Sequence, residues 1–70
     1  MKLKLFIEHK KGSFEAFESV KAVKLMRTGK KDALISTYTD GTTEKIYISD
    51  IKTAFLLDLD THYEVFRYEV

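Results

Sequence analysis

The sequence contains no cysteine and no proline, and its three glycines stand singly at positions 12, 29 and 41. Without cysteine the fold can use neither a disulfide bridge nor a thiolate metal site, and this composition fits a reducing, cytoplasmic compartment. With no proline and no low-complexity tract, no linker divides the chain, so we predict a single domain over residues 1–70. Isolated glycines also exclude a glycine-rich loop of the kind that cradles phosphate groups.

Long apolar runs are missing as well. Apolar runs extend only a few residues, Leu5–Ile7 among them, so we expect no transmembrane helix, no signal-peptide core and no membrane partner. A hydrophobic content of 44% beside a charged content of 33% is typical of a globular chain rather than a disordered one. The composition therefore predicts a small folded domain close to the lower size limit for folding alone.

The stretch Ala33–Asp50 contains the clearest structural signal. Two β-prone runs flank Asp40–Gly41, and Asp–Gly between such runs is a strong hairpin signal because a tight turn needs positive φ angles. With a two-residue loop, Ile35 would face Ile46 on an aliphatic face suited to a core. The opposite face would pair Leu34 with Tyr47 and Tyr38 with Thr43, and would also carry Ser36 and Lys45 at the surface or at an interface.

The segment Phe14–Arg27 admits two interpretations. Ser13 and Gly29 stand where a helix would be capped, but the apolar residues between them scatter around a helical axis. As strand, Phe14–Ala16 and Val20–Ala22 alternate, and Val23–Leu25 continue in the opposite phase, which requires a bulge or a corner. We favour two short strands, roughly 13–18 and 20–27, over a helix.

The remaining segments predict strands. Lys2–Glu8 alternates between an apolar side and a side with Lys2, Lys4 and Phe6. Ile51 anchors a strand, Lys52–Asp58, that is apolar on both faces. The last segment, His62–Val70, is rich in aromatic and β-branched residues. The expected fold is all-β, or β-rich with at most one short helix. We predict a small antiparallel meander of six to seven short strands that forms a barrel or a two-layer sandwich.

The order of these elements carries a family resemblance. A hairpin turning at Asp40–Gly41, followed by Tyr47–Ile51 (YISDI) and a last apolar strand, resembles small SH3-like or PH-like β domains. The resemblance covers Leu25–Leu57 and implies a compact β module. No functional residue is carried over from it, because such folds serve many unrelated functions.

Charge is unevenly distributed along the chain. The first 31 residues hold nine Lys or Arg and three Glu, whereas the rest hold three Lys or Arg and eight Asp or Glu. Such segregation indicates either a basic binding face or two halves that attract each other, and we favour the second. The first alternative is a single-stranded nucleic-acid site in which aromatic rings stack bases beside basic groups, with Lys2, Lys4, Phe6 and Lys45 as its candidate face.

No catalytic pattern is present. His9 and His62 are the only histidines, and neither stands in a recognisable nucleophile–base arrangement. Asp58, Asp60 and His62 could share one face of a strand, but acidic residues at a turn are the commoner case, so we predict no metal site. We expect neither enzymatic activity nor a cofactor.

The surplus of aromatic side chains favours an interface. The candidate interface residues are Tyr38, Tyr47, Phe55, Phe66 and Tyr68, more apolar area than so short a chain can bury alone. A homodimer would cover this surface, unless the last strand covers it internally. The sequence therefore predicts a non-enzymatic binding module that self-associates and contacts a protein partner.

Overall fold

The computed structural model describes residues 2–69 and shows an all-β domain, as predicted. Its six antiparallel strands are β1 (Leu3–His9), β2 (Phe14–Met26), β3 (Ala33–Tyr38), β4 (Thr43–Tyr47), β5 (Ile51–Asp58) and β6 (Glu64–Glu69). They form one sheet in the order β4-β3-β2-β1-β5-β6, and the only helical turn described is the 3₁₀ helix η1 (Ile48–Asp50). The predicted last strand, His62–Val70, is thus shorter at its start, and Val70 lies outside the described residues.

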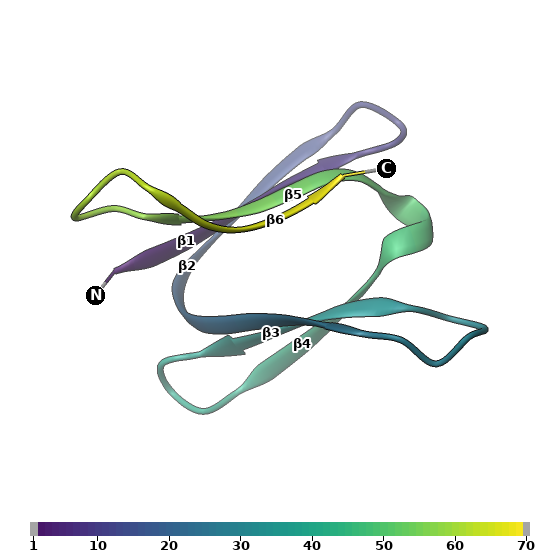
Figure 1. Cartoon of the computed structure of the whole chain (residues 1–70), viewed down its shortest axis with the longest axis horizontal. Coiled ribbons are helices and arrows are strands. Elements are labelled where there is room, and N and C mark those ends of the chain that lie inside the picture. The colour runs from purple at the N-terminus through teal and green to yellow at the C-terminus, as the bar shows by residue number, and fades with distance from the viewer. Residues whose placement is uncertain (1, 70) are drawn as a thin grey trace.

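β2 folds the sheet into two facing layers. Its first half pairs with β1 and its second half with β3, and the register shifts on both sides of Val20. Each shift inserts one extra residue into β2, and Ser19 adopts a φ of 58°, so the strand turns a corner there. Figure 1 shows β2 leaving the layer of β1, β5 and β6 and entering the layer of β3 and β4. The strand interpretation of Phe14–Arg27 is confirmed, but as one continuous bulged strand.

The β3–β4 hairpin turns at Asp40–Gly41, as predicted, but its predicted register is wrong by one residue. Ile35 pairs with Lys45 and Leu34 with Ile46, because the loop has three residues rather than two. The amide of Gly41 donates to the Tyr38 carbonyl, and the amide of Tyr38 donates to the Thr42 carbonyl. Gly41 has a φ of 90°, which completes a turn with a bulge at glycine.

The shifted register exchanges the two faces of β3, whereas Ile46 of β4 packs against the core as predicted. Leu34 and Ser36 are fully buried, whereas Ile35 is only half-buried on the outer side. The prediction that Ile35 faces the core is therefore wrong, because Ile35 lies on the outer face of β3. A one-residue slip has this effect because successive side chains of a strand point to opposite sides.

The core lies between the two layers. It consists of buried aliphatic side chains from four strands, β1, β2, β3 and β5: Leu3, Leu5, Ile7, Val20, Leu34, Ile51, Ala54 and Leu56. Ile51 is fully buried at the start of β5, as predicted for an anchor residue. Half-buried rings pack against this cluster from β2, β3 and β6. Among residues 2–69, no helix is long and apolar enough to cross a membrane.

Three connections meet at one end of the sandwich. The β1–β2 turn, the β2–β3 turn and η1 lie together at the right of Figure 1, and the β3–β4 and β5–β6 turns lie at the left. Hydrogen bonds tie the right-hand end together: the amide of Lys10 donates to the Asp50 carbonyl, and the amide of Ile48 donates to the Asp32 carbonyl. No strand ladder joins the edge strands β4 and β6 in the described part of the chain.

Candidate functional site

The outer side of the β1–β5 layer carries an exposed apolar surface. Phe6 of β1 stacks on Phe55 of β5 with ring centroids 5.0 Å apart, because the two residues are paired in register. Phe14 and Ala16 of β2 extend the surface beyond β1, and Phe14 is 75% exposed. These residues and Thr53 line a hollow of about 330 Å³. We call this surface the aromatic face: Phe6, Phe14, Ala16, Thr53 and Phe55.

Three basic side chains among the described residues border the aromatic face, and each is paired with a carboxylate of the same face. Lys4 lies 5.4 Å from the centroid of the Phe6 ring and 3.7 Å from Glu18. Lys52 lies 3.8 Å from Glu8. Arg67 lies over the Phe55 ring, 5.2 Å from its centroid, and binds Glu64 and Glu69. Three basic groups thus meet four carboxylates, so the surface is not basic.

The ion pairs of Arg67 shift the pKa values of the groups that form them. The hydrogen bonds that Arg67 donates to Glu64 and Glu69 raise the pKa of its guanidinium. The hydrogen bond from Arg67 in turn lowers the pKa of Glu64. Because each bond is made to the charged form of its partner, both groups stay ionised at neutral pH. The positive charge of Arg67, at the edge of the aromatic face, is therefore balanced by the carboxylates of Glu64 and Glu69.

The five predicted interface residues do not lie on one surface. Phe55 belongs to the aromatic face, whereas Phe66 and Tyr68 pack against the core from β6. Tyr38 also packs against the core and donates a hydrogen bond to Glu44 at 2.8 Å. Burial and then this hydrogen bond raise the pKa of its phenol. Tyr47 is exposed on β4 in the other layer, so of the five residues only Phe55 lies on the surface that holds the exposed Phe14.

The predicted nucleic-acid face is also divided. Lys4 and Phe6 are neighbours on the aromatic face, but Lys4 is engaged with Glu18. Lys2 is exposed just before β1. Lys45 is exposed on β4 in the other layer, where it pairs with Ile35 of β3. The four residues therefore do not form one basic surface.

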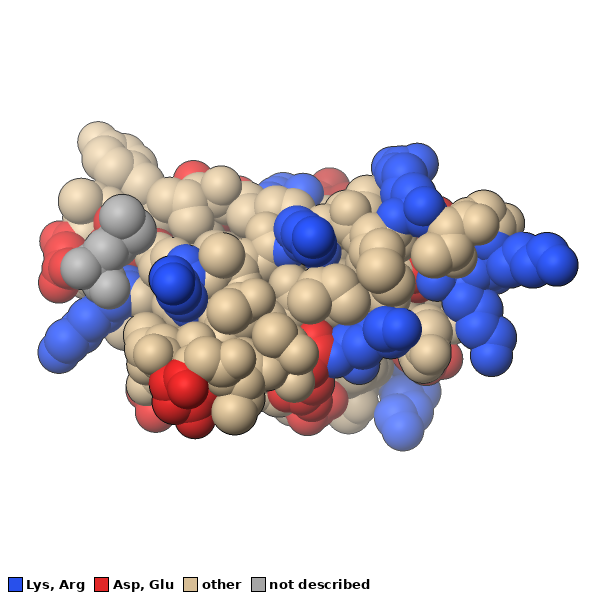
Figure 2. All heavy atoms as spheres, turned by 90° about the horizontal axis from the view of Figure 1, so that it is seen from below, with Lys and Arg blue, Asp and Glu red and all other residues tan. Residues whose placement is uncertain are grey.

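A different group of lysines gathers where the three connections meet. Lys10 and Lys11 lie in the β1–β2 turn, Lys30 and Lys31 lie in the β2–β3 turn, and all four are exposed. We call this region the lysine end. Figure 2 shows basic side chains clustered at this end of the molecule, on the right. None of the four lysines forms a salt bridge with another described residue.

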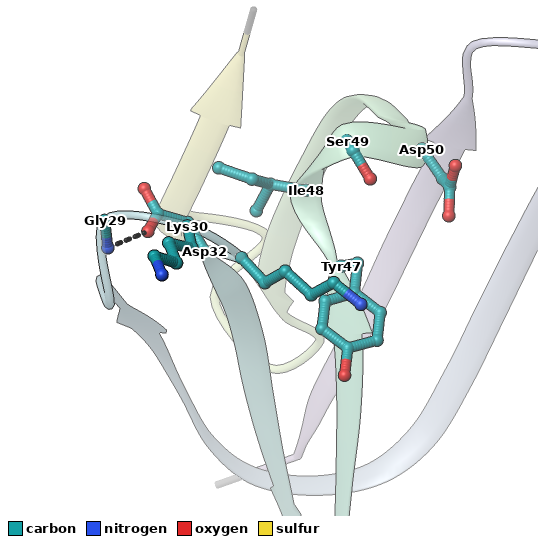
Figure 3. Close-up of a pocket in the computed structure, with 8 residues that line it drawn as sticks. Gly29, Lys30, Asp32, Tyr47, Ile48, Ser49 and Asp50 are labelled. Atoms are coloured by element: carbon teal, nitrogen blue, oxygen red, sulfur yellow. Dashed lines mark hydrogen bonds between the residues drawn. The ribbon is translucent and has the colours of Figure 1, made fainter.

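Two hollows flank η1 at the lysine end. One, of about 330 Å³, is lined by Lys30, Lys31 and Tyr47; the other, of about 460 Å³, is lined by Lys10, Lys11 and His9. Both include Ser49 and Asp50, so they adjoin across η1. Figure 3 shows the Tyr47 ring among the residues that line the first hollow. The ammonium of Lys31 is 5.6 Å from the centroid of this ring.

The carboxylates at the lysine end are partly engaged within the protein. The side chain of Asp32 accepts hydrogen bonds from the amides of Thr28 and Gly29, and the second of these is drawn in Figure 3. Glu15 pairs with His9 at 2.5 Å. Asp50 faces both hollows. The four lysines thus outnumber the carboxylates that line the hollows.

Asp58, Asp60 and His62 serve the β5–β6 turn. Asp58 accepts a hydrogen bond from the Asp60 amide, and the amide of His62 donates to the Asp58 carbonyl. The φ of His62 is 63°, so the segment is not the extended strand that would align the three side chains. Within residues 2–69, no group of three His, Asp or Glu side chains is placed to hold a metal ion.

The sequence did not single out Phe14, and it indicated the four lysines only as clusters in two turns, not as one surface. Phe14, Phe6 and Phe55 come from three separate segments, and they meet only because β1 lies between β2 and β5. The Lys–Lys pairs at 10–11 and 30–31 were visible, but nothing local shows that their turns adjoin. Comparison of the chain with protein-family models, with curated proteins and with solved structures found no match.

Proposed function

We propose that this chain is a non-enzymatic β binding module whose aromatic face binds a second copy of the same chain. The observation that carries the proposal is Phe14, which is 75% exposed beside the stacked rings of Phe6 and Phe55. A surface group of aromatic rings, here one exposed and two half-buried, is typical of a protein–protein interface, because aromatic side chains cover a large area with few rotatable bonds. The predicted assembly is a homodimer.

The charges around the aromatic face favour a second copy over a nucleic acid. In a two-fold symmetric contact the same patch meets itself, so a patch of one sign would repel its own copy. The aromatic face carries basic and acidic groups side by side, and each meets its opposite within a few ångströms. A phosphate backbone would instead require a surplus of positive charge, which this surface lacks.

The size of the chain supports the same proposal. A 70-residue domain buries a smaller share of its surface than a larger domain does, and its core here is a single layer of aliphatic side chains. Covering the rings of both copies would add apolar burial worth about 1.5–3 kcal/mol for each fully buried large side chain. Self-association would therefore stabilise a fold that lacks disulfides.

Light scattering with a matched pair of variants tests the proposal. Phe14→Glu places a charge in the aromatic face, whereas Tyr63→Glu places one at the β5–β6 turn, far along the sequence, on a side chain 73% exposed. Both parent residues are nearly as exposed as in an unfolded chain, so neither change should unfold the domain. We expect a dimer for the parent and for Tyr63→Glu at tens of micromolar, and a monomer for Phe14→Glu.

The size of the effect follows from symmetry. Each dimer loses two phenyl rings, about 2 kcal/mol for each, so Kd should rise roughly 1000-fold. A parent chain that stays monomeric at every concentration would overturn the proposal. Equal dissociation by both variants would show that the contact depends on net charge and not on the aromatic face.

A further inference from the structure

We infer that the lysine end binds the phosphate backbone of a single-stranded nucleic acid, on a surface separate from the aromatic face. Four lysines line two hollows that adjoin across η1, and none of them is paired with a carboxylate among the described residues. On the aromatic face, by contrast, each basic group has an acidic partner. Four of the eight described lysines that form no salt bridge therefore lie where the three connections meet.

The ligand must carry several negative charges in a row. Lys30 and Lys31 lie on one side of η1, and Lys10 and Lys11 lie on the other, so a single small anion would reach one pair only. A chain of phosphates that crosses η1 at Ser49 would pass both pairs. Each phosphate neutralised in this way releases a bound counterion, which is the main source of affinity in such complexes.

Tyr47 indicates a nucleic acid rather than an acidic peptide. Its ring is 41% exposed within the first hollow and lies beside the ammonium of Lys31. A ring with one free face next to a basic group can stack an unpaired base while the lysine contacts the adjoining phosphate. Bases in a duplex are stacked on each other and present no free face, so the fit is to a single strand.

Fluorescence anisotropy with a labelled thymidine oligonucleotide tests the inference. Four phosphate contacts predict a slope of about −2.8 for log affinity against log salt, which is roughly a 50-fold loss between 50 and 200 mM salt. Lys30→Gln with Lys31→Gln should halve this slope. The matched control is Lys21→Gln with Lys24→Gln, which removes the same charge from exposed positions of β2 outside both hollows and should leave the slope unchanged.

A second pair of variants separates stacking from charge. Tyr47→Ala should weaken binding about 5-fold or more, because it removes the stacking ring. Tyr63→Ala removes an exposed ring from the opposite end and should have no effect. A polyglutamate peptide of equal charge should bind more weakly than the oligonucleotide, and so should a duplex of the same length.

Three results would overturn the inference. The first is no binding at low salt, and the second is an equal loss of affinity in the two double-lysine variants. The third is binding of the polyglutamate peptide or the duplex at least as tight as that of the single strand. The Phe14→Glu variant keeps all four lysines and Tyr47, so it should bind the oligonucleotide even where self-association is lost.

Discussion

One buried atom, the hydroxyl oxygen of Ser36, allows a test of how the core is packed. Its side chain is fully buried on β3, between Glu44 of β4 and Val23 of β2, and its hydroxyl has no hydrogen-bond partner among the described residues. A buried polar group without a partner costs about 1–3 kcal/mol relative to the same group in water. Ser36→Ala removes this group and little volume. We therefore expect the variant to be more stable than the parent by about 1 kcal/mol.

The measurement is urea and thermal unfolding followed by circular dichroism. In a domain of this size, 1 kcal/mol should raise the melting temperature by about 4–8 °C. Ser49→Ala, at an exposed position of η1, is the control and should change stability by less than about 0.5 kcal/mol. A loss of stability in Ser36→Ala would refute the reasoning, because it would show that the hydroxyl is satisfied, either by water or by the Tyr38 phenol on the same face.

Two further predictions concern the β3–β4 turn. Gly41→Val should destabilise the domain by about 1 kcal/mol or more, because a β-branched residue resists the observed φ of 90°. The cost is conformational, since no neighbouring atom obstructs a Cβ at this position. Unchanged urea unfolding would contradict this turn geometry. The hydroxyl and then the amide of Thr42 donate hydrogen bonds to Asp40 and lower the pKa of its carboxyl. A carboxyl with a lowered pKa in the folded state stabilises the fold above its unfolded pKa, and this contribution is lost as the pH falls through the folded value. The stability difference between Asp40→Asn and the parent should therefore shrink below about pH 4, and a difference that does not vary with pH would contradict it.

Local chemistry was enough to predict the fold class and most of the strands. Alternation in Lys2–Glu8, the Asp40–Gly41 turn and the apolar strand after Ile51 all led to elements that the structure contains. The hairpin register was not predictable in the same way, because Asp–Gly suits both a two-residue loop and a three-residue loop with glycine at the bulge. In the observed three-residue loop the side chain of Asp40 accepts two hydrogen bonds from Thr42.

The surfaces could not be predicted, because they depend on strand order. The strand order was not predicted from the sequence; β1 lies between β2 and β5 and so brings Phe14 and Phe55 to either side of Phe6. The two bulges in β2 then fold the sheet and bring two lysine-bearing turns to η1. Both arrangements arise from contacts between residues far apart in the sequence, and pattern reasoning does not reach them.

The most direct test of the aromatic face as a self-association surface is an NMR dilution series. The backbone amide signals of the uniformly labelled parent chain would be followed from near-millimolar to low-micromolar concentration. We predict that the signals that move are those of Phe6, Phe14, Ala16, Thr53 and Phe55 and their immediate neighbours, and that Phe14→Glu abolishes the change. Signals that move instead on β3 and β4, or no signal that moves at any concentration, would contradict the account.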